Sequence, residues 1–538
     1  MINLDDIRRH AAGCPEGVAL VDGENQLTWQ EFAGAVERVA AGLAQRMPEQ
    51  GPVRSVFLAD RGWELVVVMA ACATLGISCT GLDPAADTEQ LTQVLDRLEP
   101  SMVFTSRAYR PVLDRCLWPA GPRALHILLD GPVTERTPGQ RTGPCLVGFE
   151  DLLGTEPLAA LPEARRYESF TVVPGGRQPR LAVRRTPTEV RQLVDLVDEF
   201  GFDASDVHLL AAPLWEQSAR DLTRALMALG ARVVVGAQGA PAALAATIRQ
   251  ARVTTGVIDP VTLTELLAHP DSADLAGAGR LRCLFTPGRH VGRWTVNTAW
   301  ERLGPVLHLA ACAPETGLTG MMTPEESLVV PVRSARPTLG TTVVVLDEQG
   351  AVAPPGRTGR VAVAGTGVMD GYLHDEDGEG PFVTLDVGQG EQRFLVTDDL
   401  GHLDEQSRLV LTGRGTGVPL LERDAAVDSA LFRLEADLLN LPCLRDTAVM
   451  RVDHPDLGDS LVVPFIAVAV GREATGLQAL TATCARRLPS LPAHVLAVDD
   501  IPYSPTGRIR ETELLDSVVP IIALNLQLEQ SMHQEIAT

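Results

Sequence analysis

The chain has 538 residues, 45% of them hydrophobic, so it is long enough for two or more domains with packed cores. Its formal charge of -23 argues against nucleic-acid binding, which needs a basic surface. No apolar run approaches the roughly 18 residues of a membrane span, and the opening MINLDDIRRHAAGC shows no secretory signal. The nine cysteines include no C-x-x-C pair, which favours free thiols in a reducing, cytoplasmic environment.

The sequence contains no lysine, so all 46 residues counted as Lys+Arg are arginine. One interpretation is a GC-rich genome that prefers arginine codons. The other is that primary amines are a liability in a protein that holds an activated acyl group. In either case no lysine can serve as nucleophile, base or phosphate clamp.

The first 330 residues alternate between short apolar strands and helices. Residues 17–47 predict strand, turn, strand and an amphipathic helix, with Thr28 and Glu31 forming a capping box. Residues 63–76 predict a buried helix that Gly76 closes. This alternation is typical of a doubly wound, mainly parallel sheet. The other expected elements are strands at 55–60, 101–106, 124–130, 206–213, 231–237 and 254–259 and a helix at 187–201.

The pattern changes after residue 330. Residues 341–365 predict two strands joined by a D-E-Q-G turn, and therefore an antiparallel meander. From about residue 415 a smaller α+β module follows, with helices at 425–440 and 476–488 and strands at 446–452 and 462–470. The expected fold is α/β: a large N-terminal part of doubly wound sheets with a small β-subdomain, then a small α+β C-terminal lid.

Several motifs together resemble the adenylate-forming superfamily of acyl-CoA synthetases, peptide-synthetase adenylation domains and luciferases. Residues 394–414, FLVTDDLGHLDEQSRLVLTGR, are similar to its Y-x-T-G-D-L…G-R block, and IPYSPTGRIRETEL at 501–514 to its P-x-T-G-K-I-x-R block. LTWQEF and GISCTGLDP are earlier landmarks. PRLAVRRT at 179–186 is closest to aryl- and acyl-acid AMP ligases. The resemblance covers residues 15–515 and implies an N-terminal domain at 1–413, a hinge at 414–417, a lid domain at 418–519 and a tail at 520–538.

The resemblance implies a nucleotide site whose motifs are only partly kept. Asp399 corresponds to the acid that holds the ribose hydroxyls, and Arg414 to the arginine beside the hinge. The phosphate loop is changed: Gly175 and Gly176 match a G-G pair and Arg180 takes the place of lysine. The valines and proline before them supply no side-chain donors, so a plain connecting loop is the alternative interpretation.

Three further catalytic positions follow from the family pattern. The Y-G-x-T-E motif becomes ACAPETG, so Glu315 is the expected metal-binding acid, or Thr316 fills that position in a shifted register. No aromatic residue precedes them to stack on adenine. Arg508 replaces the mobile lysine of the lid, and the segment that lines the pantetheine path differs.

The expected acyl pocket involves Trp215 and Glu216, with Arg289 on a following loop as a candidate carboxylate partner. Each has a structural alternative, since a tryptophan is often core and a loop arginine is often solvated. Cys312 lies near the expected cleft, but we expect an inert thiol there.

The sequence thus favours a repurposed family member in specialised metabolism that binds a small carboxylic acid or a carrier-bound acyl or aryl group without conventional adenylation. One alternative is a true AMP ligase with a rewritten phosphate site, which alone would need Mg-ATP. The other is a non-catalytic partner of a synthase. The expected partners are the acid or an acyl or aryl carrier protein, with no nucleic acid and no membrane.

Overall fold

The computed structural model describes most of the chain, and all structural statements below concern the described residues. These are residues 2–48, 53–118, 123–131, 145–164, 168–173, 179–185, 189–237, 239–273, 275–278, 280–287, 291–330, 333–374, 381–388, 390–414, 424–455, 457–468, 473–503 and 509–537.

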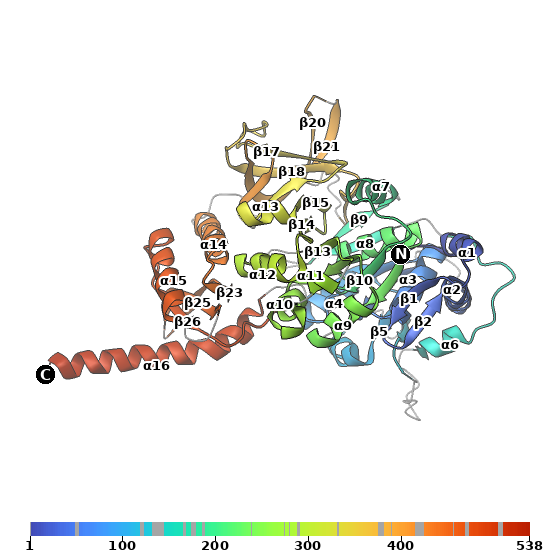
Figure 1. Ribbon diagram of the computed structural model, residues 1–538, viewed down its shortest axis with the longest axis horizontal. Helices are drawn as coiled ribbons and strands as arrows, with labels where there is room; N and C mark the ends of the chain where they lie inside the picture. The colour runs from blue at the N-terminus through green and yellow to red at the C-terminus, as the bar shows by residue number, and fades with distance from the viewer. Residues whose placement is uncertain are drawn as a thin grey trace.

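A 14-stranded sheet runs through the large N-terminal part (Figure 1). Its parallel half has the strand order β14-β13-β12-β10-β11-β1, and β2 closes the edge as an antiparallel hairpin strand. The strands of this half are β1 (Val18–Asp22), β2 (Asn25–Thr28), β10 (Val207–Ala211), β11 (Arg232–Val235), β12 (Thr255–Ile258), β13 (Cys283–Pro287) and β14 (Leu307–Ala313).

A second, fully parallel sheet has the order β4-β3-β5-β6-β7. The largest apolar core joins Phe32 of α2 (Trp29–Ala44), Val67 of α3 (Trp63–Leu75) and Leu226 of α8 (Gln217–Leu229) to Phe57 of β3 (Arg54–Leu58) and Val233 of β11. These helices therefore fill the space between the two sheets. The strands are β3 (Arg54–Leu58), β4 (Ser78–Gly81), β5 (Met102–Thr105), β6 (Leu125–Leu128) and β7 (Cys145–Gly148).

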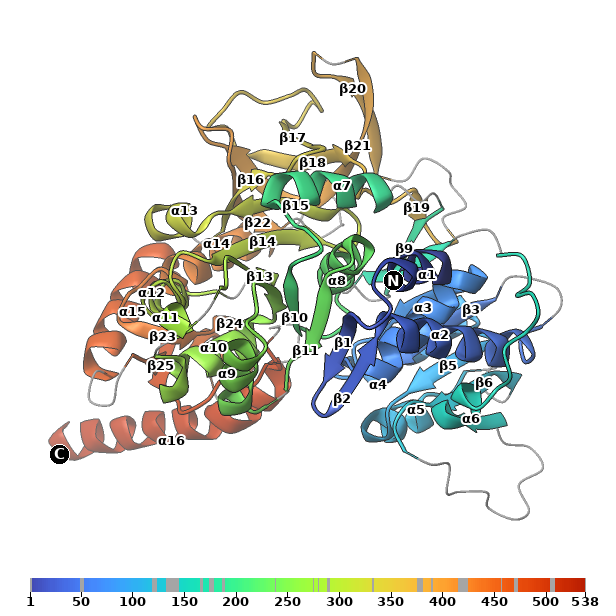
Figure 2. The same cartoon turned by 45° about the vertical axis from the view of Figure 1, so that its right-hand side comes forward.

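Helices cover both faces of the central sheet, as the doubly wound expectation requires. On the second face, Leu244 of α9, Leu263 of α10 and Val296 of α12 pack against the strands, and Figure 2 shows these helices on the side of the small C-terminal domain. The helices of the large part are α1 (Leu4–Gly13), α2 (Trp29–Ala44), α3 (Trp63–Leu75), α4 (Thr88–Leu98), α5 (Arg110–Arg115), α6 (Phe149–Leu153), α7 (Glu189–Phe200), α8 (Gln217–Leu229), α9 (Pro241–Gln250), α10 (Pro260–Ala268), α11 (Leu275–Ala278), α12 (Arg293–Leu303) and α13 (Pro324–Val329).

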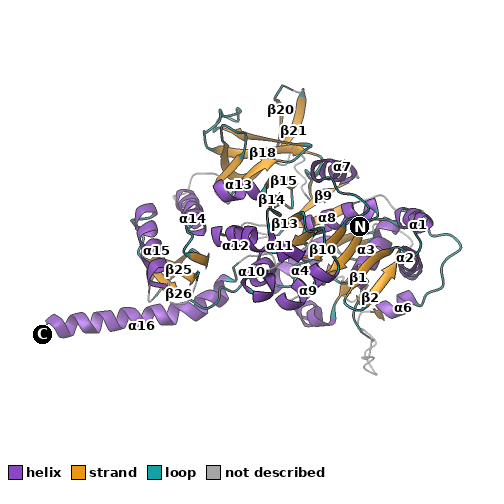
Figure 3. Cartoon of the chain, in the orientation of Figure 1, coloured by secondary structure: helices purple, strands orange, loops and turns teal. Residues whose placement is uncertain are grey.

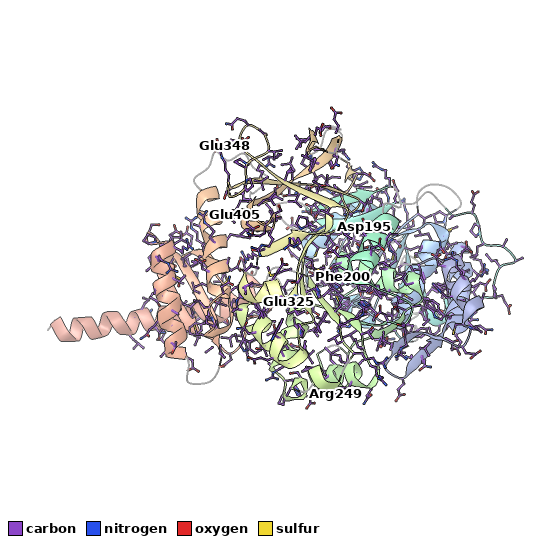
Figure 4. The ribbon with its side chains drawn as sticks, turned by 45° about the horizontal axis from the view of Figure 1, so that its top comes forward. Asp195, Phe200, Arg249, Glu325, Glu348 and Glu405 are labelled. Carbon is purple, nitrogen blue, oxygen red and sulfur yellow. The ribbon has the colours of Figure 1, made fainter. Side chains whose placement is uncertain are left out.

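The other half of the large sheet is antiparallel, as expected from the change of pattern after residue 330. Figure 3 shows it as a group of orange strands set apart from the helix-covered part, with exposed acids such as Glu348 and Glu405 at its periphery (Figure 4). Its strands are β15 (Gly317–Met322), β16 (Ser334–Pro337), β17 (Thr341–Leu346), β18 (Gly359–Gly365), β20 (Phe382–Asp386), β21 (Glu391–Leu403) and β22 (Leu409–Arg414); a separate three-stranded sheet, β19-β9-β8, comprises β8 (Ser169–Val173), β9 (Arg180–Arg184) and β19 (Gly371–Tyr372).

The C-terminal domain is a four-stranded sheet with helices on both faces. Leu434 of α14 and Leu480 of α15 pack on one face, and Leu514 and Val518 of α16 on the other. Its elements are α14 (Asp424–Leu439), β23 (Leu444–Thr447), β24 (Met450–His454), β25 (Gly458–Ala467), α15 (Glu473–Arg487), β26 (Ala493–Ala497) and α16 (Glu511–Ala537).

The structure confirms some of the local predictions and corrects others. Thr28 and Glu31 form the capping box at α2, and Gly76 ends α3 in the left-handed region at φ 65°. The single strand expected at 446–452 is wrong, because β23 and β24 are separate strands that both pair with β25. A helix also crosses the expected tail boundary at residue 520, since α16 continues through Pro520. Within the described residues, no helix has both the length and the apolar character to cross a bilayer.

Candidate active-site cleft

A cavity of about 130 Å³ lies where the antiparallel strands of the large part meet α14 of the C-terminal domain. We call it the cleft. Its lining combines an apolar wall with charged side chains, of which Arg333 is buried and the others are partly open to solvent. The apolar wall includes Ala335, Val361, Val363, Leu395, Leu409 and Phe432, and the charged side chains are Arg180, Glu315, Arg333, Asp398 and Asp399.

Strand β9 presents two arginines to the cleft side because side chains alternate along a strand. Leu181 and Val183 face the apolar core under the five-stranded sheet, whereas Ala182 belongs to a different core cluster on the opposite face. Arg180 and Arg184 share the face of Ala182. The side chain of Arg180 is 43% exposed, while Arg184 is 1% exposed, so the two arginines have different roles.

Buried Arg184 fixes the turn that carries Glu315. Its Nη2 donates to the carbonyl of Pro314 at 2.7 Å, and its Nε and Nη2 donate to the carbonyl of Gly367 at 3.0 and 2.9 Å. These carbonyls come from chain segments more than 100 residues away. Because a buried guanidinium is costly unless its donors are used, these bonds hold the turn between β14 and β15 in one position.

Arg180 lies between two carboxylates. Its Nη2 is 3.3 Å from Asp398 Oδ2 and 4.0 Å from Glu315 Oε1. The guanidinium also stacks on the ring of Tyr372, 4.5 Å from the centroid. We call Arg180, Glu315, Tyr372 and Asp398 the Arg180 cluster.

Tyr372 reaches this cluster through strand pairing. It lies opposite Ala182 in the β9–β19 ladder, so Arg180 is its diagonal neighbour. Its hydroxyl donates to Glu315 Oε1 at 3.4 Å. Burial and the nearby Glu315 carboxylate raise the pKa of Tyr372 well above its usual value, so the phenol stays protonated and remains a donor at neutral pH.

Asp399 lines the cleft beside the Arg180 cluster. Its backbone N–H donates to Thr397 Oγ1 at 3.2 Å, and that hydroxyl donates to the carbonyl of Val361 at 2.9 Å. Asp399 is also the register partner of Arg414 across β21 and β22. The two residues expected at a ribose clamp are therefore neighbours, although the side chain of Arg414 lies outside the described part.

The C-terminal domain supplies one wall of the cleft. The Arg333 guanidinium stacks 4.1 Å from the centroid of Phe432 and donates to the carbonyl of Phe432 at 3.1 Å. It also forms an ion pair with Glu435. A second contact joins Arg293 Nη2 to Asn440 Oδ1 at 3.0 Å. The shape of the cleft thus depends on how α14 is docked.

The expected pocket residue Trp215 lies in the main core and does not line the cleft. It is 7% exposed, and its Nε1 donates to Asp60 Oδ1 at 3.2 Å. A Cβ on Gly81 would come within 2.5 Å of the Trp215 backbone, so that close approach requires glycine. Glu216 occupies the N-cap position of α8 without a side-chain capping hydrogen bond, and it also does not line the cleft. Both stay predictions as substrate contacts.

The remaining expected site residues fall into two groups. Glu315 and Thr316 both line the cleft, and Thr316 is buried with its hydroxyl 2.8 Å from that of Thr319. Cys312 also lines the cleft. Outside the described residues lie Gly175, Gly176, Arg289 and Arg508.

Sequence reasoning missed Asp398, Tyr372, Arg184 and Arg333. Asp398 could have been found as the neighbour of Asp399 in the T-D-D sequence. Tyr372 could have been found as the single aromatic in DGYLHD. Nothing in the sequence distinguishes Arg184 from the adjacent Arg185.

The cluster offers a cation, two carboxylates and a phenol donor, which suits the binding of a polar group more than nucleophilic attack. Within the described ranges, no set of three or more His, Cys, Asp or Glu side chains is placed to hold a metal ion. Glu315, the expected metal ligand, instead lies beside Arg180 and accepts from Tyr372.

Comparisons of the sequence and of the structure with known proteins indicate the same family. The family described as AMP-binding enzyme matches residues 7–143 and 183–373, more than half of the chain. A probable non-canonical nonribosomal peptide synthetase, CymA of Salinispora arenicola, is 28% identical over 93% of this chain, which spans only 6% of that relative. An indoleacetate–CoA ligase of Aromatoleum aromaticum is 23% identical over 98% of this chain and 99% of its own length.

Among solved structures, the amide bond synthetase McbA of Marinactinospora thermotolerans has a TM-score of 0.73 and 22% identity, covering 95% of this chain and 98% of that chain. At this identity the similarity shows the fold. The expected α/β architecture with a small C-terminal domain is confirmed.

Proposed function

Because this chain belongs to the AMP-binding enzyme family, we propose that it is a repurposed member that acts in specialised metabolism without conventional ATP-dependent adenylation. It binds a small acid or, preferably, a carrier-bound acyl or aryl group in the cleft. The observation that carries this proposal is the place of Arg180 between Glu315 and Asp398.

The donor set of the cleft does not fit bound Mg-ATP. Magnesium is held by carboxylate and phosphate oxygens in near-octahedral geometry. Here the Glu315 carboxylate that the family pattern assigns to the metal has a guanidinium 4.0 Å away and a phenol donating to it. Both contacts are made to Oε1, so a metal ion bound through that oxygen would compete with Arg180 and Tyr372.

Charge favours a neutral ligand. Two arginines and three carboxylates line the cleft, so its lining carries an excess of one negative formal charge. A free carboxylate is repelled by this excess, whereas an acyl group joined to a carrier as a thioester is neutral. The apolar wall with Phe432 then accepts the hydrocarbon or aryl part. The proposed partner is accordingly an acyl or aryl carrier protein.

Thermal unfolding with calorimetry tests the proposal on the full-length protein. We expect no saturable stabilisation by Mg-ATP or AMP at millimolar concentration, and saturable stabilisation by a neutral benzoyl thioester of N-acetylcysteamine, with benzoate as the anionic control. A ligand at 100 times its Kd stabilises the folded state by about 2.7 kcal/mol. Stabilisation by Mg-ATP that disappears in Asp399→Ala would refute the proposal.

The placement of Asp399 favours a second candidate, an AMP ligase with a rewritten phosphate site. Asp399 lines the cleft and is the register partner of Arg414, and these are the two residues that the resemblance assigns to a nucleotide clamp. In that case Arg180 and Arg508 replace the two lysines of the family. Pyrophosphate exchange with a panel of aryl and acyl acids distinguishes this candidate. If neither nucleotide nor thioester binds, the non-catalytic synthase partner is the remaining interpretation.

A further inference from the structure

Helix α16 extends outward beyond the C-terminal domain (Figures 1 and 2). Its first turns are anchored, because Leu514, Val518 and Ile522 are buried in the core beneath the small sheet. Leu526 still packs against this core, and the helix continues outward beyond it. An anchored base with a projecting continuation is a suitable geometry for contact with another molecule.

Around the point where the helix leaves the core, it carries an exposed apolar stripe. Ile521, Leu524 and Leu528 are 51%, 57% and 54% exposed. Their spacing of i, i+3 and i+7 places them on one helix face, which lies in line with buried Leu514, seven residues before Ile521, and beside the line of Val518 and Ile522. Single exposed apolar residues need no explanation, but an aligned set on one helix is typical of an interaction surface.

The charges of this segment favour one class of partner over others. Residues 511–538 contain five acidic residues and no arginine or lysine. A second copy of the helix would bring five more carboxylates and no cation, and an anionic membrane would be repelled in the same way. A helix with basic residues beside its apolar stripe is attracted instead, because flanking charges select partners in helix pairs.

We propose that Ile521, Leu524 and Leu528 form a docking surface for a partner helix whose apolar stripe is flanked by arginine or lysine. This surface is separate from the cleft, so it does not depend on the proposed function.

Two synthetic helical peptides test this surface on the full-length protein. Both carry the same leucine stripe at i, i+3 and i+7, but one is flanked by arginines and the other by glutamates. We expect the arginine peptide to bind at least about tenfold more tightly in a fluorescence-anisotropy titration. The difference shrinks in about 0.5 M salt, because exposed charges are then screened.

Variants locate the binding. We expect the triple variant Ile521→Gln, Leu524→Gln, Leu528→Gln to bind the arginine peptide at least about tenfold more weakly. Far-UV circular dichroism verifies that the helix remains, since the three side chains lie outside the core. The matched control removes three exposed aliphatic side chains elsewhere and keeps full binding: Val329→Gln, Leu339→Gln and Val352→Gln.

Three results would overturn the proposal. Equal binding of the two peptides would show that charge does not select the partner. Unchanged binding of the arginine peptide by the triple variant would show that the stripe is not the binding surface. If analytical ultracentrifugation detects a dimer and the triple variant abolishes it, the stripe binds a second copy of this chain instead.

Discussion

Two tyrosine–carboxylate pairs in the large part have similar chemistry and different surroundings. Tyr109 donates to Asp60 at 2.5 Å, and Trp215 donates to the other oxygen of the same carboxylate. Asp60 is 8% exposed. Tyr372 donates to Glu315 at 3.4 Å, where the neighbour is the partly exposed cation Arg180.

The surroundings determine in which of the two networks a ligand can replace a hydrogen-bond partner. Around Asp60, Trp215 donates from inside the core and Tyr109 from a partly buried position against a core cluster, so water replaces these donors less easily. Around Glu315 the bonds are longer and one partner is a half-exposed side chain. A ligand can take the place of that partner at low cost, which is why we assign binding to the second network.

The largest expected effect is from Asp60→Ala. This change leaves the Tyr109 hydroxyl and the Trp215 Nε1 without their acceptor in the core. We expect a loss of about 3 kcal/mol in the free energy of unfolding, measured by urea denaturation of the large part. Glu315→Ala, the matched change in the cleft, is expected to cost no more than about 1 kcal/mol. Equal losses would contradict the comparison.

A third pair, Tyr503 and Asp446 in the C-terminal domain, extends the comparison to pH. Burial raises the pKa of Asp446 to about 6, against the hydrogen bonds from Tyr503 and the Thr447 N–H. The folded state then holds a proton that the unfolded state releases above pH 4, so stability falls as pH rises from about 4 to 6. We expect a loss of about 2 kcal/mol over that window. Asp446→Asn should flatten the profile; an unchanged profile would show that another group titrates.

Removing the tyrosine hydroxyl from each of the first two pairs tests the same difference with a smaller change. Tyr109→Phe leaves a buried Asp60 oxygen with one donor fewer, and we expect a cost of about 1.5 kcal/mol. Tyr372→Phe removes a 3.4 Å contact in an open site, so we expect no more than about 0.5 kcal/mol. Thermal unfolding of the two variants side by side measures the difference, and a reversed order would be inconsistent with a replaceable network in the cleft.

An equally small stability change is expected from Arg180→Gln. Its ion pairs involve a 43% exposed side chain, so the free energy of unfolding should change by no more than about 0.5 kcal/mol. The cleft, however, loses the cation between two carboxylates. Titration calorimetry should then detect tighter Mg²⁺ binding than in the unchanged protein. Weaker or equal Mg²⁺ binding would show that Arg180 does not compete with a cation there.

Much of the architecture could be predicted because hydrophobic period and turn residues act locally. The capping box at Thr28 and the left-handed Gly76 are determined by a few neighbouring residues. The β23–β24 break was missed because nothing in residues 446–452 interrupts the apolar alternation strongly; only the pairing of both strands with β25 reveals it.

The site was predictable where a motif places residues on one turn or ladder. Glu315, Thr316 and Asp399 meet at the cleft for that reason. The resemblance to the family suggested Trp215 as a pocket residue, but in the structure its indole turns toward Asp60, 155 residues earlier in the chain. Which way a side chain turns depends on distant partners, and the same limit hid the inward orientation of Arg184.

The strand order has a consequence for synthesis. Leu20 of β1 pairs with Val233 of β11. The first strand therefore cannot complete its pairing until more than 200 further residues have been synthesised. At ordinary elongation rates the ribosome needs about 10 to 40 s to make that stretch. During this interval the β1–β2 hairpin has an unpaired edge, which in a nascent chain invites contact with chaperones or with neighbouring chains.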